Sequence, residues 1–288
     1  MSDARPPAIL SIQSHVVFGH VGNSAAAFAI QRLGCEVMSI HTVQFSSHAG
    51  YPGWRGEVFR PALIDELMIG LGSRGVLAHC DAALTGYVGA VEVGLAMQRA
   101  VSTLRAANPK ALYCCDPVIG DVGRGVYVRE GIAEFMRERA VPAADILTPN
   151  HFELDLLSGR ASTDLDETRA ALRGLHARGP KLIMVTSLIL ADTPPDALDV
   201  LLSEGGALWR VRTPRLPIAV SGAGDLLAAL FVAHLLRDAA PPRALALAAS
   251  SVYGVIAATA LAKAGEMALI AAQDELVKPS RMFAPKSV

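Results

Sequence analysis

Short apolar runs alternate with Ala-rich segments along most of the chain, and this alternation limits the possible folds more than any other feature. The runs predict strands over Ala8–Ser14, Glu36–Phe45, Ala82–Tyr87, Ala111–Cys115, Asp145–Leu147 and Lys181–Thr186. Predicted helices lie between the strands, among them Asn23–Leu33, Pro61–Leu71 and Val91–Ala107. Strands that alternate with helices over short connections form a mostly parallel sheet with helices on both faces. The sequence therefore predicts a three-layer α/β/α fold.

The pattern changes after about residue 195. Leu198–Leu202 and Ala207–Arg212 flank the segment Ser203–Gly206, which ends in two glycines and predicts a β-hairpin. Two long Ala-rich helices are expected after the hairpin, over Asp225–Arg237 and Arg243–Ala262. The C-terminal part is thus expected to add antiparallel strands and two apolar helices to the sheet.

Composition predicts one well-packed domain. Of the 288 residues, 52% are hydrophobic and only 18% are charged, which argues against disorder. No linker, repeat or low-complexity segment divides the chain. We therefore expect a single domain over residues 1–288, with a flexible segment at 1–7 and a tail at 280–288.

Charge and cysteine usage narrow the partners and the compartment. The chain has 26 Lys and Arg against 27 Asp and Glu, a formal net charge of -1, which does not favour nucleic acid or an anionic membrane. The four cysteines, Cys35, Cys80, Cys114 and Cys115, lack metal-binding spacing. The apolar stretches are interrupted by Gly, Ser, His or Lys, so no transmembrane helix is predicted. These features favour a cytoplasmic protein with reduced thiols.

A glycine-rich turn precedes the first of the two C-terminal helices. It reads Gly222-Ala223-Gly224-Asp225 and runs directly into apolar residues. A helix start offers unpaired N–H groups and the positive end of a dipole, which together suit a phosphate. An anion hole beside one carboxylate, Asp225, is what phosphoryl transfer to an alcohol requires. The alternative interpretation is an ordinary helix start in which Asp225 only favours the dipole.

Polar residues gather where the predicted strands end. The clusters are Ser14-His15, Gln44–His48, Thr85–Tyr87, Cys115–Asp121, Thr148–Glu153 and Thr186-Ser187. In parallel sheets the carboxyl ends of the strands share one edge, where ligands bind. Loops at the opposite edge look like plain turns. This concentration of polar residues predicts a functional site.

Several of these segments resemble the pyridoxal kinases of the ribokinase superfamily. The matching blocks, which follow the expected order from about residue 8 to 265, are Ile12–Val17, Gly22-Asn23, Thr42–Ser46, Leu84–Tyr87, Cys115–Val118, Thr148–Asn150 and Gly222–Asp225. The resemblance implies a ribokinase-like fold and ATP-dependent phosphorylation of the 5′-hydroxymethyl group of pyridoxal, and often of pyridoxine and pyridoxamine. It also implies a homodimer, Mg²⁺ with ATP, and an assisting monovalent cation such as K⁺. A Walker A sequence is absent.

The resemblance also implies roles for individual residues. Asp225 is the general base on the 5′-hydroxyl, and the amides of Gly222, Ala223 and Gly224 form the anion hole. The implied substrate-binding residues are Ser14, Val21, His48 and Tyr87, together with Asp225. Ser14 suits the pyridine nitrogen because a hydroxyl can donate or accept a hydrogen bond. For Tyr87 the alternative is an ordinary strand-end tyrosine, and for His48 a solvated loop histidine.

A second group of residues is expected around the metal and the triphosphate. Asp116, Asp121 and Glu153 are the candidate metal residues, and Mg²⁺ prefers such hard oxygen ligands, often through water. The candidate ATP-binding residues are Asp116, Asn150, Glu153, Thr186, Ser187, Gly222 and Gly224. Glu153 also has a purely structural interpretation, because an acid in the first turn of a helix favours the dipole. Asp116 before Pro117 could be a plain turn former, but the resemblance favours a functional role.

Two segments depart from the pattern or leave alternatives open. Where the family usually has Asn-His-Thr, this chain has Ser47-His48-Ala49, so a hydroxyl expected near the substrate is missing. We expect that loss to cost on the order of 1 kcal/mol of binding, which makes the preferred vitamer an open question. The glycine-rich segment Gly120–Tyr127 is either a moving lid over ATP, from which Arg124 reaches phosphate, or a static loop.

Three alternative functions remain at this point. A hydroxymethylpyrimidine kinase shares the fold, the glycine turn and a heteroaromatic alcohol substrate, but the Ile12–Val16 block argues against it. A sugar kinase of the ribokinase type would need several polar residues for sugar hydroxyls and usually a lid sheet. A vitamer-binding protein without catalysis is disfavoured by intact Asp225 and its glycines.

Overall fold

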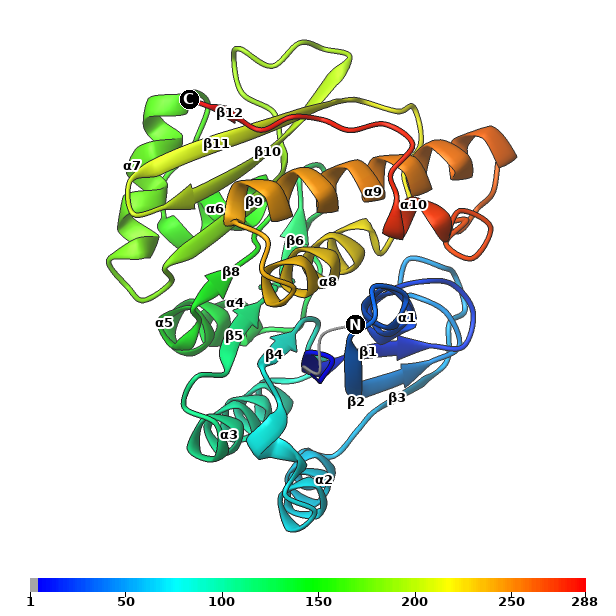
Figure 1. The fold of residues 1–288 in the computed structure, drawn as a ribbon, viewed down its shortest axis with the longest axis vertical. Coiled ribbons are helices and arrows are strands. Elements are labelled where there is room, and N and C mark those ends of the chain that lie inside the picture. Colours follow the sequence, from blue (N-terminus) through cyan, green and yellow to red (C-terminus); the bar gives the residue numbers. More distant parts are fainter. Residues whose placement is uncertain (1–4) are drawn as a thin grey trace.

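A ten-stranded sheet runs through the middle of the molecule, with helices on both faces (Figure 1). The computed structural model describes residues 5–288. The strands are β1 Ala8–Val16, β2 Glu36–Phe45, β3 Gly56–Val58, β4 Ala82–Thr85, β5 Leu112–Cys115, β8 Ile146–Leu147, β9 Leu182–Leu188, β10 Ala197–Glu204, β11 Ala207–Pro214 and β12 Lys286–Ser287. Their order in the sheet is β12-β11-β10-β9-β8-β5-β4-β1-β2-β3. The expected three-layer α/β/α architecture is confirmed.

The six central strands, from β9 to β2, are parallel to one another. Antiparallel strands close the sheet at both edges, with β3 beside β2 and the β10–β11–β12 ribbon beside β9. The predicted hairpin is present, but its strands reach further than expected. Ser203 and Glu204 belong to β10, and only Gly205 and Gly206 form the turn, both with positive φ (55° and 88°). Two consecutive positive φ angles are typical of the tight turn that joins twisted strands.

The helices cover the two faces in separate groups. One face packs against α2 Pro61–Ser73, α3 Val91–Ala107, α4 Ile132–Phe135, α6 His151–Ser158 and α7 Leu165–His176. The other face packs against α1 Asn23–Arg32, α8 Ala223–Leu236, α9 Pro241–Ala262 and α10 Asp274–Val277. Short helical segments lie at Val76–His79, Met136–Ala140 and Val141–Ala143. The predicted helices agree with these bounds to within two residues at each end.

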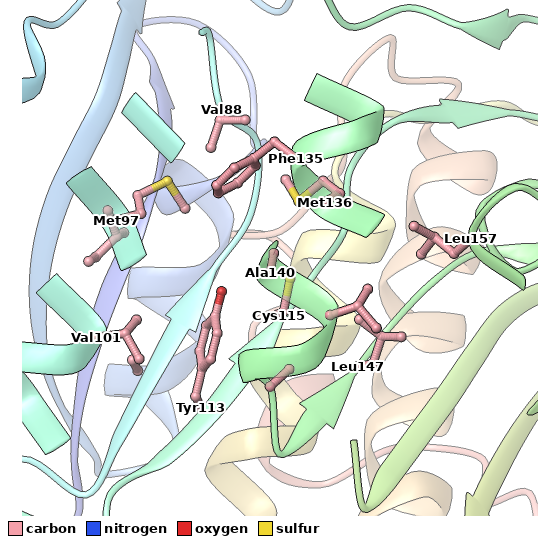
Figure 2. Close-up of a cluster of buried hydrophobic side chains, with 14 of the residues drawn as sticks. Val88, Met97, Val101, Tyr113, Cys115, Phe135, Met136, Ala140, Leu147 and Leu157 are labelled. Carbon is pink, nitrogen blue, oxygen red and sulfur yellow. The ribbon is translucent and has the colours of Figure 1, made fainter. Parts of the chain in front are cut away.

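The core on the first face shows why this chain needs large apolar side chains between sheet and helices. Figure 2 shows Met97 and Val101 from α3 facing Phe135 and Met136, with Tyr113 from β5 beneath them. All of these side chains are at most 6% exposed. Burial of a side chain of this size contributes about 1.5–3 kcal/mol, so these side chains stabilise the packing of the helices on the sheet.

The second face is built around two Ala-rich helices. Residues Leu226 to His234 of α8 are buried on every side, because the helix lies between the sheet and α9. By length and composition alone α9 could cross a membrane, but 61% of its most apolar stretch is buried inside the protein. Its apolar character is therefore accounted for by packing against α8 and the sheet.

The chain ends are partly tied to the sheet. The segment expected as a C-terminal tail includes β12, which pairs with Trp209 and Arg210 of β11. At the other end, Arg5 forms a two-bonded ion pair with Asp81 (2.7 Å for both bonds). The rest of the segment that we expect to be flexible, residues 1–4, lies outside the described residues.

Candidate active site

The predicted polar clusters lie at one edge of the sheet, where the parallel strands end. From β1 the chain passes to β2 on one side, and it later returns to β4 on the other side of β1. Such a reversal opens a space at the carboxyl ends of the two strands, and ligands of open α/β sheets bind there. Ser14 lies near the end of β1, Tyr87 follows β4, and Asp116 follows β5 directly. The start of α8 is close to the same edge, because Gly222 packs on the β1–α1 loop.

The glycine turn at the start of α8 has little freedom. Gly222 has φ of 88°, which side chains rarely tolerate, and a Cβ there would lie 1.8 Å from the carbonyl oxygen of His20. The helix begins at Ala223, and its first intrahelical bond runs from the amide of Leu226 to the carbonyl of Gly222. By helix geometry the amides of Ala223, Gly224 and Asp225 have no intrahelical acceptor. The turn therefore presents three N–H groups and the positive end of α8 at the edge of the sheet.

Asp225 lies in the first turn of α8, close to the loop that follows β1. Its carboxylate accepts a hydrogen bond from the amide of Gly22, which favours the ionised form. Burial is the larger effect and raises the pKa of Asp225 to about 6. A carboxylate whose pKa lies near neutrality can accept a proton at neutral pH and remains basic enough to hold it.

Asp116 is a buried acid whose pKa responds to the charge of Asp225. The side chain is 7% exposed, and the Thr148 hydroxyl donates to it over 3.2 Å. Burial, followed by the charges of Asp225 and Glu153, raises the pKa of Asp116 well above its usual value. Mutual repulsion of buried carboxylates is relieved when a cation binds between them. Asp116 and Asp225 thus form an acidic centre beside the amides of α8.

Glu153 holds two segments of the site together. It forms a capping box with Asn150, because each side chain accepts a hydrogen bond from the other residue's amide (2.9 Å for both). Its second oxygen accepts from the amide of Ile119 (2.8 Å). Burial raises the pKa of Glu153 to about 8, and these amide donors oppose the rise. The side chain thereby fixes the Asp116–Asp121 segment to the start of α6.

Asn150 completes this connection. Its side-chain amide donates to the carbonyl of Gly120 (2.7 Å) and to the carboxylate of Asp121 (3.1 Å). Burial raises the pKa of Asp121 above its usual value, and nearby Arg124 opposes that effect. Hydrogen bonds thus connect Asp121, Asn150 and Glu153 directly, whereas Asp116 bonds to Thr148.

These residues do not form a direct cage for a metal. Within residues 5–288 no three His, Cys, Asp or Glu side chains converge closely enough to hold an ion. Mg²⁺ keeps several waters and often takes only one or two carboxylates besides the phosphates of its nucleotide. Burial raises the pKa of both Asp116 and Asp121, and the charges of Asp225 and Glu153 raise that of Asp116 further, so a cation would favour the ionised forms. The pair fits a metal that arrives with a polyphosphate.

The contacts of Glu153 lead to a prediction about stability. We expect Glu153→Gln to lose one acceptor from the buried amide network, at a cost of about 2 kcal/mol. For a domain of this size the melting temperature should fall by roughly 5 °C. Thermal unfolding followed by circular dichroism measures the shift.

The surface variant Glu66→Gln is the matched control, because Glu66 forms an exposed ion pair with Arg60. An unchanged melting temperature in Glu153→Gln, together with a higher Mg²⁺ requirement for activity, would instead assign Glu153 to the metal.

The glycine-rich segment forms a small hairpin of its own. Strands β6 Gly120–Asp121 and β7 Gly125–Val126 pair antiparallel, and Arg124 lies exposed in the turn between them. A Cβ at Gly120 would lie 2.4 Å from the carbonyl oxygen of Gly125, so the strands approach closely. The Asn150 bond to Gly120 anchors the base of the hairpin, and the tip extends beyond it.

The predicted nucleotide residues Thr186 and Ser187 lie at an irregularity of β9. The pairing with β10 shifts between Val185 and Leu188, so two residues of β9 face one of β10. Ser187 has a φ of 51°, which is unusual for a residue other than glycine. Bulges of this kind redirect side chains and occur frequently beside functional sites. Thr186 is buried and pairs with Asn150 through a backbone bridge, whereas Ser187 is exposed.

The predicted substrate residues lie on the β1–β2–β4 side of the site. Val21 and Tyr87 pack on one small apolar cluster with Phe45. Burial raises the pKa of the Tyr87 hydroxyl. Ser14 is 7% exposed, and a Cβ on Gly22 would lie 2.4 Å from its hydroxyl oxygen. Ser14 thus lies against Gly22, whose amide bonds to Asp225, and the half-buried ring of Tyr87 lies on the apolar cluster with Phe45.

His48 lies in the loop after β2 and makes contacts that the sequence did not suggest. Its Nε2 is 3.5 Å from the carboxylate of Glu266, and its ring packs on Tyr51 with 4.5 Å between ring centres. The Tyr51 hydroxyl donates to the same carboxylate over 2.6 Å. Sequence reasoning missed Glu266 and Tyr51, since neither belongs to a recognisable motif. It also missed that Gly22 serves Asp225, although Gly22-Asn23 was part of the resemblance.

Comparisons with known proteins show the family of this chain. A family model described as phosphomethylpyrimidine kinase matches residues 71–269. The chain is 51% identical over 279 residues to a pyridoxal kinase, PdxY, of Granulibacter bethesdensis, which covers 96% of this chain and 98% of the relative. It is 50% identical over 281 residues to a pyridoxal kinase, PdxY, of Rubrobacter xylanophilus, with 97% of both chains covered.

A solved structure is similar over its whole length. It is a pyridoxal kinase from Leishmania donovani in complex with ADP and ginkgotoxin, with a TM-score of 0.91 and 32% identity, and 98% of this chain and 99% of that chain are covered. The same protein in complex with ADP and pyridoxine gives a TM-score of 0.90. The similarity extends over both halves of the sheet, and the expected ribokinase-like fold is confirmed.

Proposed function

The chain belongs to the pyridoxal kinases, within the phosphomethylpyrimidine kinase family, and we propose that it transfers the terminal phosphoryl group of ATP to the 5′-hydroxyl of pyridoxal. The product is pyridoxal 5′-phosphate, and the activity belongs to vitamin B6 salvage. One observation carries the mechanism. Asp225, whose pKa is raised to about 6, lies in the first turn of α8 next to amides that have no intrahelical acceptor.

Each part of this site has one task. The Asp225 carboxylate accepts the proton of the 5′-hydroxyl as its oxygen attacks the terminal phosphorus in line with the leaving ADP oxygen. The amides of Ala223 and Gly224, with that of Gly222, stabilise the negative charge of the phosphoryl oxygens in flight. The proton goes to Asp225, and the P–O bond to ADP breaks as the new P–O bond forms.

Asp116 and Asp121 are the residues that would hold Mg²⁺, through water, when it arrives with ATP. The ion would supply positive charge against the β- and γ-phosphate oxygens. Asn150 and Thr186 lie on the same side and are proposed to contact the triphosphate, with Ser187 beyond them. The proposal also includes an assisting monovalent cation such as K⁺, on the basis of the family resemblance.

Recognition of the vitamer is proposed for the opposite side of the site. Tyr87 and Val21 would pack against the pyridine ring, and the Ser14 hydroxyl would bond the ring nitrogen. His48 would close this side. Ala49 is exposed at the loop after β2 and supplies no hydroxyl. We therefore expect the polar substituents of the ring to contribute less to binding, with an affinity roughly fivefold lower than with a hydroxyl at this position.

The raised pKa of Asp225 predicts a pH dependence. The base must be ionised, and its pKa is about 6, so kcat/KM for pyridoxal should fall about tenfold per pH unit below 6. Initial rates between pH 4.5 and 8 measure this limb, and pyridoxine serves as a second substrate because its own ionisations differ. A fall in rate at the same pH with both substrates would show that the ionising group is on the enzyme. Rates independent of pH down to 4.5 with both substrates would contradict a base of this pKa.

We further propose that the protein is a cytoplasmic homodimer whose partners are small molecules only. The argument rests on the resemblance, on near-neutral charge and on four buried reduced cysteines. Helix α1, which borders the second face of the sheet, is the proposed contact. Neither nucleic acid nor a membrane is part of the proposal.

A substrate panel tests the proposed function. ATP consumption is measured with Mg²⁺ and K⁺ for pyridoxal, pyridoxine and pyridoxamine in parallel. Turnover on pyridoxal supports the proposal, and the ranking of the other two shows what Ala49 changes. No turnover on any vitamer, with pyridoxal still bound, would favour a binding protein that has lost catalysis.

A further inference from the structure

Glu266, in the loop after α9, contacts two separate segments of the proposed active site. One carboxylate oxygen accepts a hydrogen bond from the Tyr51 hydroxyl (2.6 Å) and lies 3.5 Å from His48. The other accepts from the backbone amide of His20 (3.3 Å). The Glu266 side chain is only 14% exposed, so these bonds are shielded from water. One side chain thus joins the loop after β2 to the turn after β1.

The loop after β2 has few other anchors near its tip. His48 and Tyr51 stack on each other, and Tyr51 lies 6.1 Å from the ring of Phe18. The tip itself, from Ala49 to Gly53, is exposed apart from Tyr51. Among the described residues, the bond to Glu266 is the only hydrogen bond that the Tyr51 side chain makes. His48 packs on the Tyr51 ring and also lies near Glu266.

The turn after β1 carries groups that contact Gly222 and Asp225 at the start of α8. A Cβ on Gly19 would lie 2.4 Å from the Glu266 carboxylate, so this turn fits closely against it. The carbonyl of His20 packs on Gly222, and the amide of Gly22 donates to Asp225. Met267, the next residue, also lies close to Gly222, because a Cβ on Gly222 would be 3.0 Å from its side chain. A shift of this turn would therefore move both the anion hole and the base.

We infer that Glu266 is a positioning residue for the kinase reaction. It fastens the loop after β2 through Tyr51 and the turn after β1 through the His20 amide. In this proposal it contacts neither the substrate nor the reacting atoms. The two contacts have separate effects. The hydrogen bond from Tyr51 acts on binding of the vitamer, and the hydrogen bond from the His20 amide acts on the chemical step. This inference rests on the proposed function.

Two variants distinguish the two contacts. Tyr51→Phe removes only the hydrogen bond between Tyr51 and Glu266. KM for pyridoxal should therefore rise about fivefold, with kcat and KM for ATP within twofold of the unchanged protein. Glu266→Gln retains one acceptor but turns an NH₂ group toward a donor. KM for pyridoxal should then rise and kcat should fall, each by about tenfold. Steady-state kinetics with each substrate varied in turn measure these constants.

The controls keep the outcomes distinct. Glu66→Gln makes the same chemical change in an exposed ion pair on α2 and should leave all constants unchanged. Melting temperatures establish that each variant is folded at the assay temperature. Equal effects on both KM values, or a lower melting temperature with unchanged constants, would reduce Glu266 to a structural role and overturn the inference. Absence of turnover in the unchanged protein would instead contradict the proposed function itself.

Discussion

Asp225→Asn is expected to lower kcat for pyridoxal by about 10²–10⁴-fold, which is the usual contribution of a positioned general base. The asparagine side chain has nearly the same shape and can still accept the hydrogen bond from the amide of Gly22. It has no affinity for the proton of the 5′-hydroxyl, so the attacking oxygen must lose that proton unaided. The change therefore removes one chemical step and leaves the surrounding geometry in place.

Binding should survive this substitution. Isothermal titration with pyridoxal, and separately with Mg²⁺ and a non-hydrolysable ATP analogue, is expected to give affinities within a few-fold of the unchanged protein. ATP affinity should even improve slightly, because one negative charge near the phosphates is gone. A kcat that stays within tenfold would show that Asp225 is not the base. Lost binding of both ligands would show that it is a structural residue.

Gly222→Ala is expected to have the second largest effect. The residue has φ of 88°, and its new Cβ would lie 1.8 Å from the His20 carbonyl oxygen, which is backbone and cannot move aside alone. Either α8 or the turn after β1 must shift. The amides of the anion hole then no longer point at the phosphoryl oxygens. Loss of one such donor typically costs about 10²–10³-fold in kcat.

Gly174→Ala in α7 is the matched control, since a Cβ there meets no atom within 4 Å and its φ is ordinary. That variant should keep full activity and gain slight stability, because alanine is the better helix former. Steady-state rates are to be compared below the melting temperature of each variant. Normal kcat in folded Gly222→Ala would mean that the turn tolerates a shift, and that these amides are not the anion hole.

Local signals were sufficient for most of the fold. Each strand of the parallel centre is a short apolar run bounded by turn residues, and its alternation with helices predicts a parallel sheet. The glycine turn was predicted in the same way, because Gly222 and Asp225 flank the start of an apolar helix within four residues. Such features depend on neighbours in sequence, which a reader of the sequence sees directly.

Contacts between distant segments could not be predicted. Glu266 meets Tyr51 across 215 positions, and nothing near Gly265-Glu266 in the sequence distinguishes this acid from a solvated one. The same holds for the Gly22 amide that serves Asp225, and for β12, whose two residues are strand only because β11 offers an open edge. For Glu153 both interpretations were open, and the structure adds a capping box whose relation to the metal is tested by the Glu153→Gln variant.

A competition between two alcohols tests the central claim most directly. Purified protein is given MgATP, K⁺ and equal concentrations of pyridoxal and hydroxymethylpyrimidine, and the two phosphorylated products are separated and quantified at early times. The ratio of products equals the ratio of kcat/KM values. We expect pyridoxal 5′-phosphate to exceed the pyrimidine phosphate by at least tenfold, and both products to disappear in Asp225→Asn. An excess of the pyrimidine phosphate would contradict the assignment of pyridoxal as the substrate.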